Sequence, residues 1–338
     1  MNKKRVLAML LAGAMALSMT ACGGNSASTD GSSNDGGASA SGGSYKVSVI
    51  LKTLAAEYWQ YVKSGAEDYA SEHSDKVTVE VKGPSSETAF DEMQNMIETD
   101  LSSGSYDGVI ISPLQSDTAA QLVSGTKLPI VAIDTNFTAP EVKSFVGTGN
   151  EAAAKKGGEA AVEAAKAAGW TDIKCIEIAG VQGDQTNTAR MNGYKAGVEE
   201  AGGTFLSDEV QYADATADRA TTAMEAIIQT HPEGIAIICA NNDDMAMAAA
   251  RAAQGHDAYK NTIFLGFNGD RAACEAILAG QMTMSVAQMA YEMGYKAVET
   301  MVQVLDGETV DEFVDSGSDV VTPDNAQERL DTLKTQLH

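Results

Sequence analysis

The sequence is poor in basic residues, and this shortage excludes several kinds of protein before any motif is considered. Its 338 residues contain 23 Lys and Arg against 47 Asp and Glu, which gives a formal net charge of −24. A groove for nucleic acid and a polybasic membrane surface both need clustered Lys and Arg. The sequence therefore predicts no nucleic-acid partner.

Histidine and cysteine are also scarce. The four histidines are His73, His231, His256 and His338, and the cysteines after the N-terminal region are Cys175, Cys239 and Cys274. None of them has the spacing of metal ligands, so we expect no metal and no cofactor. Cys175 and Cys239 are interpreted as small buried side chains on strands, and a disulfide is the alternative.

Proline is equally rare, with six residues, and charged residues make up 21% of the chain, whereas hydrophobic residues reach 44%. Such a composition is typical of a folded chain with ample core material, not of a disordered one. The length suits one large domain or two domains of about 150 residues each.

The N-terminus carries an apolar run that is too short to cross a membrane. Three basic residues at 3–5 precede an apolar stretch from 6 to about 19, whereas a spanning helix needs about 20 residues. A basic start followed by a short apolar core is typical of a secretory signal, so we predict that residues 1–21 are removed.

The end of this run, Met19-Thr20-Ala21-Cys22, resembles a bacterial lipobox, in which small residues precede a cysteine that becomes lipidated. Cys22 is then the first residue of the mature chain and anchors the protein to a cell membrane without spanning it, on the cell surface or the periplasmic side. An ordinary secretory signal with a chance cysteine is the alternative. Residues 22–44 are predicted to be this cysteine and a flexible linker, because 23–44 consist of Gly, Ser, Ala, Asn, Asp and Thr.

From Tyr45 onward, short apolar strands alternate with amphipathic helices. The pattern predicts a strand over Lys46–Leu51, a helix over Glu57–His73 and a similar alternation as far as the helix Ala290–Leu305. It favours an α/β fold with parallel sheets flanked by helices. More than ten strands are unusual in one sheet, so we predict two lobes with a break near Gly147-Thr148-Gly149.

Polar and aromatic side chains follow several predicted strands, at the edge where open parallel sheets bind ligands. They are Lys52, Tyr58, Trp59, Asp134, Arg190, Asn242, Asn268 and Gln288. Carboxylates, guanidinium groups and amides bind hydroxyls, and aromatic faces cover the C–H face of a sugar ring. The set contains no nucleophile–base pair and no phosphate loop, so it predicts a neutral, hydroxyl-rich ligand and no enzymatic activity.

Short motifs occur in a fixed order over about residues 46–310. They are Leu51-Lys52-Thr53-Leu54 with Tyr58-Trp59, Ile111-Ser112-Pro113-Leu114, Pro129–Asp134, Ala189-Arg190 with Asn192-Gly193, Thr230-His231-Pro232, Ala240–Met245, Gly266-Phe267-Asn268-Gly269 and Val286-Ala287-Gln288. This ordered set resembles the ribose/allose group of bacterial periplasmic-binding-type solute receptors. The resemblance implies two Rossmann-like lobes, three hinge crossovers and a monosaccharide held in the cleft between the lobes. It also implies an ABC permease with a cytoplasmic ATPase as partner, and we expect a monomer.

The resemblance also carries ligand roles onto the eight residues above. Asp134 and Arg190 would each bond a pair of hydroxyls, and Trp59 with Tyr58 would stack on the ring. Asn242 and Gln288 would bind the remaining hydroxyls, with Lys52 and Asn268 completing the set. The crossovers would divide the chain into a first lobe, 45–149 plus 289–317, and a second lobe, 150–288 plus 318–338.

Three positions depart from the pattern of this group. Asn268 stands where Asp is common, Ala56-Glu57 replaces an Asn-Pro pair, and a second stacking aromatic falls on Ala215 unless Tyr212 takes its place. A pentose, a hexose, a polyol and a furanosyl signal molecule all suit the residue mixture.

Structural roles are the alternatives for the same residues. They are core packing for Trp59, a solvated charge for Lys52, capping for Asp134 and Asn242, a turn for Asn268 and a hinge hydrogen bond for Gln288. A ligand-sensing subunit of a chemoreceptor or sensor kinase is the alternative function. A surface hydrolase is disfavoured because no catalytic set follows the strands.

Overall fold

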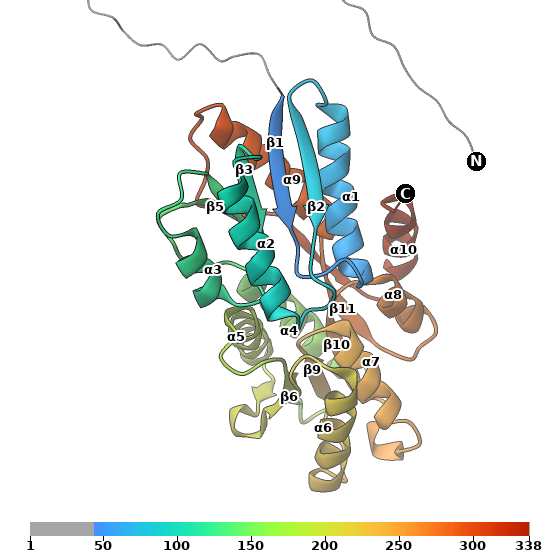
Figure 1. Cartoon of the computed structure of the whole chain (residues 1–338). Coiled ribbons are helices and arrows are strands. Elements are labelled where there is room, and N and C mark those ends of the chain that lie inside the picture. Colours follow the sequence, from blue (N-terminus) through green and yellow to red (C-terminus); the bar gives the residue numbers. More distant parts are fainter. Residues whose placement is uncertain (1–43, 338) are drawn as a thin grey trace, which may run out of the picture. The chain divides into compact units, whose positions relative to one another are not determined.

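The computed structural model describes residues 44–337, which form two α/β lobes (Figure 1). The elements of the first lobe are β1 (Tyr45–Ile50), α1 (Glu57–Glu72), β2 (Val77–Lys82), α2 (Phe90–Ser103), β3 (Gly108–Ile111), α3 (Ser116–Val123), β4 (Ile130–Ile133), β5 (Val142–Gly147), α9 (Ala290–Leu305) and β12 (Phe313–Asp315). The elements of the second lobe are α4 (Asn150–Ala167), β6 (Lys174–Ala179), α5 (Gln185–Glu200), β7 (Thr204–Phe205), η1 (Ser207–Glu209), β8 (Gln211–Tyr212), α6 (Ala217–Thr230), β9 (Ile237–Ala240), α7 (Asp243–Ala252), η2 (Asp257–Tyr259), β10 (Ile263–Asn268), α8 (Arg271–Leu278), β11 (Met284–Gln288), β13 (Ser318–Val321) and α10 (Ala326–Thr335).

Each lobe is built on one sheet. The first sheet has the strand order β12-β5-β4-β3-β1-β2, and all of its pairs are parallel. The second sheet has the order β13-β11-β10-β9-β6-β7, with β8 also paired to β6, and only β13 runs antiparallel. Parallel strands put their carboxyl ends at one edge, so each lobe gathers the residues that follow its strands. In Figure 1 the arrowheads of β1 and β2 point toward the second lobe.

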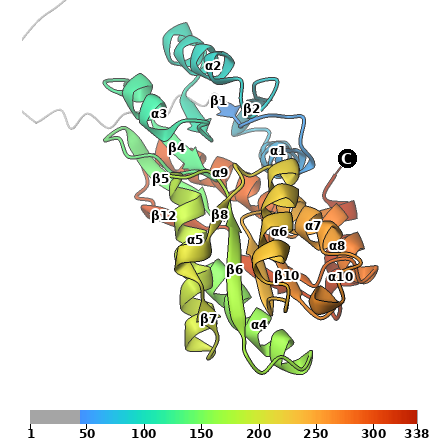
Figure 2. The same ribbon diagram turned by 90° about the horizontal axis from the view of Figure 1, so that it is seen from below.

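Alternate residues of each strand pack on opposite faces of its sheet, because side chains of a strand have a period of two. In the first sheet, Ile50 and Ile111 face α2 and α3, whereas Val49 and Ile110 face α1 and α9. In the second sheet, Cys175 packs toward α4 and α5, and the next residue, Ile176, packs toward α6 and α7. Figure 2 shows β6 between α5 on one side and α6 on the other.

Glycines bring one pair of helices in each lobe unusually close. A Cβ on Gly65 of α1 would lie 1.9 Å from the Tyr291 carbonyl oxygen of α9. A Cβ on Gly193 of α5 would lie 2.2 Å from the Glu151 carbonyl oxygen in the first turn of α4. Side chains larger than hydrogen would therefore push these helices apart.

The chain passes between the lobes three times: between β5 and α4, between β11 and α9, and between β12 and β13. The first and third crossovers are bonded to each other. The Ser316 N–H donates to the Gly147 carbonyl oxygen at 2.8 Å, and the Thr148 and Ser316 hydroxyls lie 3.4 Å apart.

The predicted fold class, two α/β lobes with parallel sheets flanked by helices, is confirmed. Periodicity did not predict β12 and β13, because these strands are only three and four residues long and carry mostly exposed or half-buried side chains. The predicted signal, Cys22 and all of the linker except Ser44 lie outside the described residues. Between residues 44 and 337, no helix is both long enough and apolar enough to span a bilayer.

Candidate functional site

The eight predicted site residues divide equally between the two lobes. Lys52 follows β1, Tyr58 and Trp59 lie in the first turn of α1, and Asp134 follows β4. In the second lobe, Arg190 lies on α5, Asn242 caps α7, Asn268 ends β10 and Gln288 ends β11. The fold thus brings both groups to the carboxyl ends of parallel strands.

Asp134 is the centre of the site residues in the first lobe. The Tyr58 hydroxyl donates to Asp134 Oδ1 at 2.8 Å, and the Thr135 hydroxyl donates to Oδ2 at 2.8 Å. Lys52 Nζ lies 3.8 Å from Oδ2. Asp134 has a φ of 62°, a left-handed conformation that is rare outside glycine and is enriched in Asp and Asn. The carboxylate is therefore held in one orientation by two donors and a cation.

Burial is the first cause that raises the pKa of Tyr58 well above its ordinary value, and the charge of Asp134 adds to it. The hydroxyl consequently stays protonated and donates to the carboxylate at neutral pH.

Trp59 lies edge-on to Tyr58, with ring centroids 5.0 Å apart and planes at 87°. Its indole Nε1 donates to Glu87 Oε1 at 2.7 Å, and the side chain is only 3% exposed. Lys52 Nζ lies 5.9 Å from the centre of its ring. The structure thus gives Trp59 the surroundings of a core residue, and its stacking role stays a prediction.

Arg190 is the centre of the site residues in the second lobe, and it is 7% exposed. Its Nε donates to Asn150 Oδ1 at 2.8 Å, and its Nη1 donates to the Asn241 carbonyl oxygen at 2.8 Å. The guanidinium carbon lies 3.8 Å from the centre of the Phe267 ring. Burial lowers the pKa of Arg190 from its ordinary value, and the negative charge of Asp134 opposes that shift.

Asn268 and Gln288 are bonded to each other. Gln288 Nε2 donates to Asn268 Oδ1 at 2.9 Å, and Asn268 Nδ2 donates to Asp270 Oδ2 at 3.3 Å. Burial and the nearby Asp243 carboxylate raise the pKa of Asp270 to about 8. Asn268, the last residue of β10, has a φ of 134°, a backbone conformation that residues other than glycine rarely adopt.

Asn242 has the capping role that the sequence left as an alternative. Its Oδ1 accepts from the Met245 N–H at 2.9 Å, and its Nδ2 donates to the Ala215 carbonyl oxygen at 3.1 Å. The amide nitrogen carries a second hydrogen, which can donate to a ligand.

Asp134 of the first lobe affects the pKa of Arg190 of the second lobe. Asp134 raises the pKa of Arg190 against the effect of burial, yet no ion pair joins these two side chains within residues 44–337. An ion pair also joins the two lobes: Arg271 Nη2 of α8 lies 3.0 Å from Glu57 Oε2 of α1.

Three polar residues near the site were missed by the sequence reasoning. Asn150 bonds to Arg190, and Thr135 bonds to Asp134. Glu177 on β6 is fully buried, and its carboxyl oxygens have no hydrogen-bond partner within the described residues 44–337. Burial raises the pKa of Glu177 to about 8, and the positive charge of Arg190 lowers it slightly. An acidic residue within the apolar stretch 175–179 is the one signal that could have pointed to Glu177.

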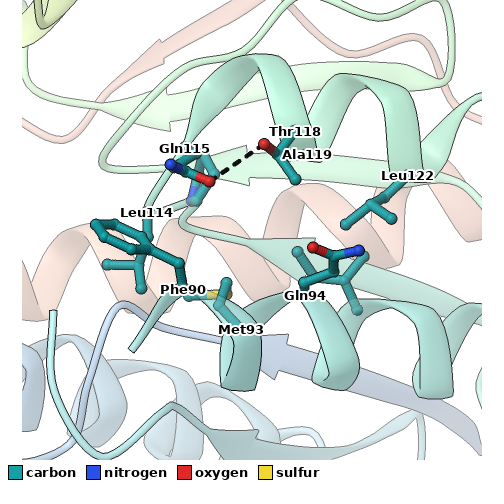
Figure 3. Close-up of a pocket in the computed structure, with 10 residues that line it drawn as sticks. Phe90, Met93, Gln94, Leu114, Gln115, Thr118, Ala119 and Leu122 are labelled. Atoms are coloured by element: carbon teal, nitrogen blue, oxygen red, sulfur yellow. Dashed lines mark hydrogen bonds between the residues drawn. The ribbon is translucent and has the colours of Figure 1, made fainter. Parts of the chain in front are cut away.

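Two cavities of the described chain lie away from these residues. The pocket in Figure 3, between the first turns of α2 and α3, has about 10 Å³, roughly the space for one water, and Phe90 and Leu114 line it. Another cavity of about 240 Å³ lies beside Trp170 at the amino ends of β6 and β9. None of the eight site residues lines either one. Over residues 44–337, no three His, Cys, Asp or Glu side chains gather as metal ligands.

Comparison with known proteins assigns a family to this arrangement. Residues 47–309 match the family model described as a periplasmic binding protein domain. The D-allose-binding periplasmic protein of Escherichia coli (strain K12) is 30% identical over 264 residues, which cover 75% of this chain and 82% of that protein. The ribose import binding protein RbsB of the same strain is 27% identical over 268 residues, covering 78% and 86%.

A solved structure has the same fold. The carbohydrate transporter solute binding protein from Agrobacterium radiobacter, in complex with D-arabinose, superimposes with a TM-score of 0.74 at 23% sequence identity. The match covers 87% of this chain and 99% of that one.

Proposed function

Because this chain belongs to the periplasmic binding protein domain family, we propose that it is an extracytoplasmic solute-binding protein that captures a monosaccharide for an ABC importer. The observation that carries the proposal is the placement of Asp134 and Arg190. They come from different lobes, the negative charge of Asp134 raises the pKa of Arg190 against the effect of burial, and the two side chains form no ion pair with each other. The similarity to D-allose-binding and ribose import proteins supports a sugar of that size.

We infer that the sugar binds between the lobes and that the lobes close on it. Asp134 with Tyr58 would supply hydrogen bonds from the first lobe, and Arg190 with Asn268 and Gln288 would supply them from the second. A ligand favours a closed form only through contacts that are missing in the open form, and groups from both lobes meet this condition. The three crossovers support a hinge motion about the segment 147–149 and its neighbours.

The available bonds suffice for tight binding. A hydrogen bond to a charged group contributes about 1.5–3 kcal/mol, and a micromolar complex needs about 8 kcal/mol. A few such bonds from Asp134 and Arg190, with neutral bonds from the amides, offset the loss of freedom on binding.

The ligand would leave the protein chemically unchanged, since the site residues offer no nucleophile with a base. An ABC permease with its cytoplasmic ATPase is the proposed partner. A ligand-sensing role is less well supported, because the relatives are import and sugar-binding proteins.

We also propose that Cys22 is lipidated and that the linker 22–44 holds the folded lobes near the membrane. Mass spectrometry of the membrane-extracted protein would detect diacylglycerol on Cys22. The Cys22→Ser variant is expected to be released from membranes, and a variant that stays bound would contradict the anchor.

The sugar-binding proposal is tested by a thermal-shift panel followed by calorimetry. Pentoses, hexoses and polyols, with D-ribose and D-allose among them, are added to the purified protein. We expect at least one monosaccharide to raise the melting temperature and to titrate with one site per chain. A folded protein that responds to no sugar or polyol would overturn the proposal.

A further inference from the structure

Asn150 joins the first crossover to the guanidinium of Arg190. It is the first residue of α4, immediately after the segment that leaves β5. Its Nδ2 donates to the Thr148 carbonyl oxygen at 3.0 Å, and its Oδ1 accepts from Arg190 Nε at 2.8 Å. The orientation of the amide is fixed by its partners, because an arginine N–H can only donate and a carbonyl oxygen can only accept.

The close packing of α5 against the start of α4 places Arg190 beside Asn150. Gly193 on α5 faces the first turn of α4, where a Cβ would lie 2.2 Å from the Glu151 carbonyl oxygen. This close approach brings Arg190, one turn before Gly193, against Asn150 at the start of α4. The contact therefore depends on where α4 begins, and α4 begins where the chain enters the second lobe.

Asn150 leaves part of the guanidinium free. Arginine has five N–H donors. Two of them donate to Asn150 and to the Asn241 carbonyl oxygen, and the ring of Phe267 supports the plane. The other three have no hydrogen-bond partner within residues 44–337 and remain for a ligand.

The nitrogen of the Asn150 amide bonds to the first crossover, at the Thr148 carbonyl oxygen. The Thr148 carbonyl belongs to the first crossover, and the Thr148 hydroxyl lies 3.4 Å from the Ser316 hydroxyl of the third crossover. A rotation of the lobes must change backbone angles in such crossover segments. Rotation of the Thr148 peptide would turn its carbonyl away from Asn150 and release the amide that holds Arg190.

We propose that Asn150 is a positioning residue that aligns the Arg190 guanidinium for the sugar when the hinge has the geometry described here. This inference rests on the proposed function, because the sugar is the ligand that Arg190 would bind. Asn150 acts through Arg190 and need not touch the sugar itself.

The first test needs no sugar. In protein labelled with ¹⁵N-arginine, the Nε–H signal of Arg190 is assigned from its loss in Arg190→Lys, and its hydrogen exchange is measured. We expect Asn150→Ala to speed this exchange at least tenfold. Asn150→Asp keeps an acceptor for Nε and should preserve slow exchange. Asn192→Ala, an exposed position on α5 two residues after Arg190, is the matched control. Unchanged exchange in Asn150→Ala would overturn the proposal.

The second test is a double-mutant cycle on sugar affinity. Asn150→Ala should weaken binding about tenfold in the wild-type background and less than twofold in the Arg190→Lys background. Equal losses in both backgrounds would assign Asn150 a purely structural role and overturn the proposal. If no sugar binds the wild-type protein, the proposed function fails, and the exchange measurement still decides whether Asn150 holds Arg190.

Discussion

The two lobes stabilise their charged site residues in different ways. In the first lobe, Asp134 has a nearby cation, Lys52, and accepts hydrogen bonds from Tyr58 and Thr135. In the second lobe, Arg190 is buried with a backbone carbonyl, an amide and an aromatic ring as partners, and has no ionic partner in the described chain. Glu177, also in the second lobe, is buried, and neither of its carboxyl oxygens has a hydrogen-bond partner among residues 44–337.

The difference indicates which lobe gains more from a ligand. A buried charge without an ionic partner lowers stability unless hydrogen bonds compensate it. Ligand hydroxyls can supply such bonds to Arg190, whereas Asp134 already has its donors. We therefore expect the second lobe to carry the larger share of the binding free energy, and the following predictions test this comparison.

The largest effect is expected at Glu177, because its carboxyl group is fully buried without a hydrogen-bond partner among residues 44–337. Burial raises the pKa of Glu177 from an ordinary value of 4.5 to about 8 in the folded protein. The unfolded chain loses this proton at lower pH, so the stability due to the protonated form is full below about pH 4.5 and is lost as the pH rises through 8. At about 1.4 kcal/mol per unit of pKa, the wild-type free energy of unfolding should fall by about 2–4 kcal/mol from pH 5 to 9 through this group.

Glu177→Gln should match the wild type at about pH 5 and exceed it in stability at about pH 9, as measured by urea unfolding. Glu225→Gln, an exposed position of the same lobe, is the control and should show no such divergence. Parallel stability profiles for Glu177→Gln and the wild type would mean that Glu177 is not buried as an unpaired acid.

The next effect compares the two charged residues directly. Arg190→Ala should weaken sugar binding about a hundredfold and Asp134→Ala about tenfold or more, since charge-assisted hydrogen bonds contribute about 1.5–3 kcal/mol each. Calorimetry gives the affinities, and circular dichroism checks that both variants fold. Arg219→Ala and Asp91→Ala, exposed positions in the same two lobes, serve as controls. A larger loss at Asp134 would reverse the comparison, and wild-type affinity in both variants would refute the site.

A smaller effect is expected at Asn242, where the question is whether an amide of the second lobe serves the fold or the ligand. Loss of its cap on α7 should lower the free energy of unfolding by about 1 kcal/mol in Asn242→Ala. Chemical unfolding and calorimetry on the same variant separate the two roles. If affinity also falls more than threefold, Asn242 contacts the sugar; unchanged stability would contradict the capping role.

The smallest effect is expected at the ion pair between the lobes. Glu57 and Arg271 are both partly exposed, so their coupling should be about 0.2–1 kcal/mol and should fade with salt. Glu57→Gln and Arg271→Gln should each weaken sugar binding by a few-fold at about 0.05 M salt and less at about 0.5 M. The pair Lys155–Glu200 lies within the second lobe, and its removal should leave affinity unchanged. Equal effects of the two pairs would show that Glu57 and Arg271 do not favour closure.

The sequence predicted the architecture well because alternating apolar strands and amphipathic helices leave few other solutions. It also predicted which residues follow the strands. The structure adds that Tyr58 is hydrogen-bonded to Asp134 and Gln288 to Asn268. Their roles toward a ligand stay predictions.

Other features could not be predicted, because they depend on contacts between distant segments. Nothing local to Asn150 indicates that a glycine on α5 brings Arg190 against it. The ion pair of Glu57 with Arg271 joins residues 214 positions apart, and only the packing of the two lobes creates it.

Closure of the two lobes around one sugar is tested most directly by small-angle X-ray scattering of the full chain. Scattering is recorded without sugar and with a saturating amount of the monosaccharide that stabilises the protein most. The radius of gyration should fall in the wild type when the sugar is added, and it should not fall in Arg190→Ala at the same sugar concentration. A wild-type protein that binds the sugar with an unchanged radius of gyration would contradict closure.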